Sequence, residues 1–143
     1  MAEAILIDRL SKRGSASKIL DITVDSAGTG AYHAGEPADE RTITTCQKHG
    51  VPVTSIARRL TPEDYAKFDY ILAMDESNLD TIRQRKPPSS KCSISLFGSY
   101  DSSAGRSRTI DDPYYGGRRG FEEAYEQCVR FADGFLDHLE KAE

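Results

Sequence analysis

Tryptophan is absent from this 143-residue sequence, and cysteine and histidine occur three times each. Cys46, Cys92 and Cys128 are an odd number of cysteines and lack the short spacing of a zinc site, and the histidines are equally scattered. Reduced thiols are therefore expected, with no disulfide framework, no metal site and no cofactor.

Long apolar runs and an excess of positive charge are also missing. The segment YILAM, residues 70–74, is among the longest apolar runs, far below the roughly 20 residues that a membrane span needs. The net charge of −4 and pI of about 5.4 exclude a general nucleic-acid binder. Charged residues near the N-terminus, Glu3, Asp8 and Arg9, make a poor secretory signal. We expect a cytoplasmic protein with one domain over residues 1–143 and neither a membrane nor a nucleic-acid partner; its oligomeric state stays open.

Apolar periodicity predicts helices that alternate with short strands. The predicted helices cover residues 1–13, 38–49 and 77–85, with two more that begin at the Thr61 cap and at Phe121. The predicted strands cover residues 22–28, 69–75 and 93–98. This alternation indicates an α/β fold, a three-layer sandwich with a parallel sheet. Ligands bind beyond the carboxyl ends of such strands, where Ser26 and Asp75 lie.

The segment over residues 99–120, SYDSSAGRSRTIDDPYYGGRRG, is too long for an ordinary connection and is typical of a functional loop. Within it, Pro113 fixes its own φ and restricts Asp112, so the carboxyl group has one preferred orientation. We interpret Asp112 as a proton donor. An Asp-Pro turn with two surface tyrosines, Tyr114 and Tyr115, is the structural alternative.

Five motifs occur in the order that is found in one known family. They are DSAGTGAYHAGEPADERT, HGVPV, FDYILAMDESNL, LFGSYD and DDPYYG. With them the chain resembles the low-molecular-weight protein tyrosine phosphatases over nearly its whole length. The resemblance implies a four-stranded sheet and a C-x5-R-S/T-P loop whose cysteine thiolate attacks phosphorus. It implies phosphotyrosine proteins or small aryl phosphates as partners.

The resemblance also assigns roles to residues of this chain. Asp112 is the general acid that protonates the leaving phenolic oxygen and later takes a proton from water. Tyr114 and Tyr115 form one wall of the substrate slot, and Tyr32 and His33 form the opposite wall. Structural support comes from Pro113, Ser26 and Asp75; the partner of Asp75, Ser26 or another donor, stays open.

One departure from the family pattern concerns the nucleophile. In the family, MAEA or a close variant follows the cysteine-to-proline loop, whereas here MAEA is residues 1–4. None of the three cysteines has an arginine six positions later. We therefore expect the chain as given to be N-terminally truncated, inactive, and short of the first strand. That strand lies between the second and third strands of the family's sheet, so residues 22–28 and 69–75 would lose a shared neighbour.

Two hypotheses follow. Either the chain is a phosphatase by descent whose upstream sequence supplies the strand and the C-x5-R-S-P loop, or it is a non-catalytic interaction module. In the second case Tyr114 and Tyr115 are candidate phosphorylation targets. An arsenate reductase of the same fold is a weaker rival, because the aromatic slot suits phosphotyrosine better.

Overall fold

The structure is a computed structural model that describes residues 1–13, 22–30, 35, 40–54, 56–101, 108–110 and 117–141. The helices are α1 (Ala2–Arg13), α2 (Glu40–Lys48), α3 (Pro62–Lys67), α4 (Glu76–Arg85) and α5 (Gly117–Lys141). The strands are β1 (Tyr70–Ala73) and β2 (Ser93–Leu96), and the 3-10 turn η1 (Phe97–Tyr100) follows β2 directly. The predicted α/β fold is confirmed, with element boundaries that differ from the sequence prediction by a few residues.

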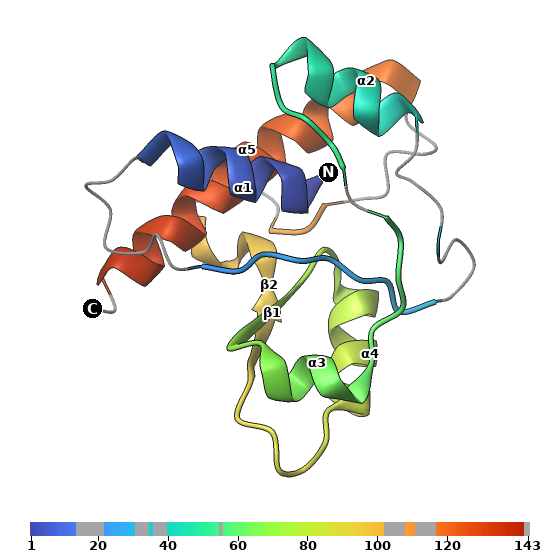
Figure 1. The fold of residues 1–143 in the computed structure, drawn as a ribbon, viewed down its shortest axis with the longest axis vertical. Helices are drawn as coiled ribbons and strands as arrows, with labels where there is room; N and C mark the ends of the chain where they lie inside the picture. The colour runs from blue at the N-terminus through green and yellow to red at the C-terminus, as the bar shows by residue number, and fades with distance from the viewer. Residues whose placement is uncertain are drawn as a thin grey trace.

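The two strands form a parallel ladder in which Tyr70 lies opposite Ser93 and Ala73 opposite Leu96. Alternate residues of β1 face different cores. Tyr70, Leu72 and Met74 pack on a large core with α1 and α5, whereas Ile71 and Ala73 pack on a smaller core with α3 and α4. Figure 1 shows these helix pairs on opposite sides of the strands, which is the expected three-layer order.

Helix α5 supplies much of the large core. Its predicted apolar stripe is buried from Phe121 to Leu136, and Phe131 has no exposed surface. The stripe packs on Tyr70 of β1, whose ring meets Phe135 edge to face at 5.2 Å, and also along α1. Two arginines of α1 bind acids of α5: Arg9 forms a two-bond fork with Asp133, at 2.9 and 3.0 Å. The helix pair is therefore fixed by apolar burial and by ion pairs at its rim.

The strand predicted over residues 22–28 is not formed in this structure. Ile22 and Val24 pack on the large core while Thr23 and Asp25 are exposed, so the alternation typical of a strand is present. Among the described residues of this segment, backbone-to-backbone hydrogen bonding begins at Gly28, whose N–H donates to the Arg58 carbonyl at 2.8 Å. A ladder needs a neighbour on which to form. In the described part of the chain no segment pairs with residues 22–27, and β1 pairs only with β2.

Candidate functional site

The candidate site lies at the carboxyl end of β1. The N–H of Ile110 donates to the carbonyl of Met74, one residue beyond the strand, at 2.8 Å. Ile110 is buried in the large core. Ile110 stands two positions before Asp112 in the sequence, and this bond holds Ile110 at the end of the strand. Parallel sheets bind ligands at this end.

Residues 108–110 are held by further contacts. The Arg108 side chain donates to the Ser99 carbonyl at 3.1 Å, and Gln127 of α5 donates to the Thr109 carbonyl at 3.4 Å. Gly98 of η1 lies so close that a Cβ there would overlap the backbone of Arg108. Arg108 and Thr109 are therefore held against both η1 and α5.

An ion pair holds Asp101, near the start of the 99–120 segment. Arg130 of α5 donates through Nε to the carboxylate of Asp101 at 2.8 Å, and the Asp101 side chain is only 4% exposed. No local pattern in the sequence indicates this pair, because the two residues are 29 positions apart and Arg130 borders an apolar stripe. Two points of the 99–120 segment, Asp101 and Thr109, thus contact α5.

Asp75 follows β1 and caps α4. Its Oδ1 accepts the N–H of Asn78 at 2.7 Å, and its carbonyl accepts the N–H of Leu79 at 3.0 Å. Such a cap satisfies N–H groups that the first turn of a helix leaves free. The described partner of the Asp75 carboxylate is thus the helix backbone. Its predicted part in supporting a catalytic site stays a prediction.

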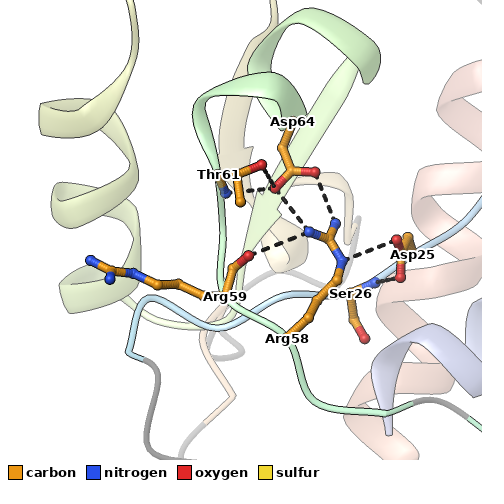
Figure 2. Close-up of polar contacts among 6 residues, drawn as sticks. All are labelled: Asp25, Ser26, Arg58, Arg59, Thr61 and Asp64. Carbon is orange, nitrogen blue, oxygen red and sulfur yellow. Dashed lines mark hydrogen bonds and ion pairs between the residues drawn. The ribbon is translucent and has the colours of Figure 1, made fainter. Parts of the chain in front are cut away.

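Ser26 lies beside a polar cluster that joins three segments (Figure 2). Its N–H donates to Oδ1 of Asp25 at 2.8 Å, and the other oxygen of Asp25 accepts from Arg58 Nε at 3.1 Å. Arg58 also binds both oxygens of Asp64, at 2.9 and 3.0 Å. Asp64 in turn accepts the N–H of Thr61 at 2.8 Å, so it closes the predicted cap of α3. The support predicted from Ser26 likewise stays a prediction.

The charges of this cluster reinforce one another. Burial of Asp64 raises the pKa of its carboxyl, but hydrogen bonds from Arg58 and from Thr61 outweigh burial and hold that pKa below its usual value. The hydrogen bond to Asp64 raises the pKa of Arg58 further above its already high value. Arg58 and Asp64 therefore stay ionised at neutral pH. Sequence reasoning found the cap and missed the arginine that binds it.

The three thiols are poorly suited to nucleophilic chemistry. Cys46, Cys92 and Cys128 are all buried and free. Burial raises the pKa of each thiol, and that of Cys128 to about 12. A nucleophilic cysteine needs the opposite shift. Cys128 lies on the apolar face of α5, inside the large core.

The remaining predicted site residues lie outside the described residues. They are Tyr32, His33, Asp112, Pro113, Tyr114 and Tyr115. Within the described ranges, no three potential metal ligands among His, Cys, Asp and Glu come together. In the same ranges no helix is long and apolar enough to cross a membrane.

Comparisons with known proteins all point to one family of phosphatases. A model of the family described as low molecular weight phosphotyrosine protein phosphatase matches residues 1–143. A Schizosaccharomyces pombe protein of that name is 44% identical over 139 residues, which make up 97% of this chain and 87% of the relative. The solved structure of Primo-1 matches with a TM-score of 0.87 at 40% identity, over 95% of this chain and 86% of that chain. DARP, a Drosophila arginine phosphatase, matches with a TM-score of 0.87 at 35% identity, over 99% of this chain and 90% of that chain.

Proposed function

Because the chain belongs to the low molecular weight phosphotyrosine protein phosphatase family, we propose that its site serves the hydrolysis of phosphotyrosine and small aryl phosphate monoesters. The bond between Ile110 and the Met74 carbonyl carries this proposal. It places the chain two residues before Asp112 at the carboxyl end of β1, where a parallel sheet offers its binding edge.

In the proposed reaction a cysteine thiolate attacks phosphorus, and the bond from phosphorus to the phenolic oxygen breaks. Asp112 gives its proton to that oxygen, so that a neutral phenol leaves. Asp112 then takes a proton from the water that attacks the cysteinyl phosphate, and inorganic phosphate leaves as the thiolate is restored. Tyr114 and Tyr115 would hold the substrate ring from one side, with Tyr32 and His33 on the other. No metal or cofactor takes part in these steps.

The nucleophile is the component that the 143 residues do not supply. Pro52, Gly98 and Gly134 stand six positions after the three cysteines, where a C-x5-R loop requires arginine. Burial and the raised thiol pKa values add a physical reason against any of the three. We therefore propose that these 143 residues alone do not turn over substrate, and that they do so when a strand and a C-x5-R-S/T-P segment precede residue 1.

The experiment compares two chains with para-nitrophenyl phosphate as substrate. One chain consists of the 143 residues, and the other carries a relative's strand and loop in front of Met1. Turnover is expected only from the second, with a loss of about 100- to 10,000-fold in kcat for its Asp112→Asn variant. Brisk turnover by the 143-residue chain would overturn the assignment of the nucleophile. Phosphotyrosine, phosphoserine and phosphoarginine peptides as competing substrates then test the class, and a preference for phosphoarginine would overturn the proposed substrate.

An interaction module without catalysis is the second candidate. It is favoured by the two cores that described residues form on the faces of β1. A module must fold by itself, so it predicts a cooperative thermal transition for the 143-residue chain. A chain that shows only a broad, noncooperative transition by circular dichroism would exclude it.

A further inference from the structure

The Arg58 side chain joins segments that the chain order keeps apart. Its Nε donates to Asp25 Oδ2 at 3.1 Å, and its two terminal nitrogens donate to Asp64 at 2.9 and 3.0 Å (Figure 2). One terminal nitrogen also lies 3.4 Å from the Arg59 carbonyl. A guanidinium suits this arrangement because its donors point outward in a rigid plane. One side chain thus links the 25–30 segment to α3.

The link continues from Asp25 to the backbone of Ser26. Oδ2 of Asp25 accepts from Arg58, while Oδ1 of the same carboxylate accepts the N–H of Ser26 at 2.8 Å. The orientation of the carboxylate, and with it the direction of the Ser26 N–H, therefore depends on the guanidinium. Asp25 is 41% exposed and the segment before it has no ladder partner among the described residues, so little else there fixes this carboxylate.

Three other contacts hold the following residues independently of the Arg58 side chain. The N–H of Gly28 donates to the backbone carbonyl of residue 58 at 2.8 Å, and the N–H of Leu60 donates to the Gly28 carbonyl at 2.9 Å. Arg85 at the end of α4 donates to the Thr29 carbonyl at 2.8 Å. The Arg58 side chain therefore reaches Ser26 only through Asp25, whereas Gly28 is held by backbone hydrogen bonds.

We propose that Arg58 is a positioning residue for the candidate site: through Asp25 it sets the orientation of Ser26 at the end of the 22–28 segment. This role rests on the proposed function, in which the carboxyl ends of the strands form the substrate site. It adds a residue that acts through another side chain and touches neither the substrate nor the reacting atoms.

The test uses the 143-residue chain with nitrogen-15 labelling. In Arg58→Met, the apolar stem is kept and all donors are lost. We expect the Ser26 amide resonance to move and its hydrogen exchange to accelerate at least about tenfold. The Gly28 amide should keep its protection, because its acceptor is a backbone carbonyl. Arg59→Met is the matched control, since Arg59 is the exposed neighbour and only its carbonyl takes part in the fork; it should leave the Ser26 resonance unchanged.

A purely structural Arg58 would give a different pattern. In that case Arg58→Met would lower the melting temperature while the Ser26 resonance of the folded chain stayed where it was, and the proposal would be wrong. Should Arg58→Met fail to fold, Arg58→Gln is measured in its place, because a shorter neutral amide cannot bind the Asp25 and Asp64 carboxylates together. An unchanged Ser26 amide exchange rate in Arg58→Gln overturns the proposal. Because no turnover is measured, failure here is distinguishable from failure of the proposed phosphatase activity.

Discussion

Replacing Asp64 by asparagine should destabilise the fold more than any surface carboxylate replacement. Asp64 is 8% exposed at its side chain and accepts from Arg58 at two positions and from Thr61 N–H. Removing one partner of a buried ion pair costs about 3–5 kcal/mol. Arg58 is 34% exposed and keeps Asp25 as a partner, so solvent screening lowers this figure. We expect a loss of about 2–3 kcal/mol, with part of it due to the lost cap.

The assay is urea unfolding at pH 7, followed by circular dichroism, with Asp80→Asn as the control. Asp80 lies on the exposed face of α4, so its replacement should change the free energy of unfolding by less than about 0.5 kcal/mol. A cost below about 1 kcal/mol for Asp64→Asn, or one equal to the control, would refute the argument that the Arg58 cluster stabilises the fold.

Acid unfolding tests the same carboxyl through its charge. The pKa of Asp64 is lowered in the folded chain, so its contribution to stability is present above the unfolded value of about 3.9. The contribution is lost as the pH falls through the lowered folded pKa. The unmodified chain should therefore lose more stability than Asp64→Asn between about pH 5 and pH 2. Parallel stability curves for the two chains would show that the charge of Asp64 is irrelevant.

Three further substitutions or reactions test the packing. Gly134→Ala should lower the free energy of unfolding in urea by about 1–3 kcal/mol, since a Cβ there would overlap the Tyr100 carbonyl. Helix propensity alone predicts the opposite, a gain of about 1 kcal/mol, so a stabilised variant would contradict the close packing. Arg130→Met should cost about 2–4 kcal/mol by leaving the buried Asp101 carboxylate without this arginine, and Arg130→Lys should restore part of it. The Cys128 thiol, with its pKa raised to about 12, should react with a disulfide reagent at pH 8 only on unfolding, and fast labelling of the native chain would contradict its burial.

Local signals in the sequence were sufficient to predict most of the helices. The three-four spacing after Phe121 identified the buried face of α5, and the TPED segment identified the start of α3. In both cases the signal lies within one element, where propensity and capping act. The order of layers followed from the alternation of helices and strands.

Pairings between distant segments could not be found in this way. The prediction of a strand over residues 22–28 used alternation alone, and alternation does not say whether a neighbour exists to pair with. The Arg130–Asp101 pair and the fork of Arg58 depend on tertiary geometry, which no spacing rule encodes. Of the candidate site, the structure places the flanks at Ile110 and Asp75, whereas the roles of Asp112 and the aromatic walls stay predictions.

Strand β1 lies between the two cores: Tyr70 and Leu72 pack on the large core, and Ile71 and Ala73 pack on the small one. Among the described residues, the small core has four buried members, Tyr65, Ala73, Leu79 and Ile82, whereas the large core spans α1, α2 and α5. Apolar burial sets how much free energy is needed to open a region. Native-state hydrogen exchange should therefore show α3 and α4 opening before α5. Such an opening would melt one flank of the strand while Ile110, which belongs to the large core, stays packed.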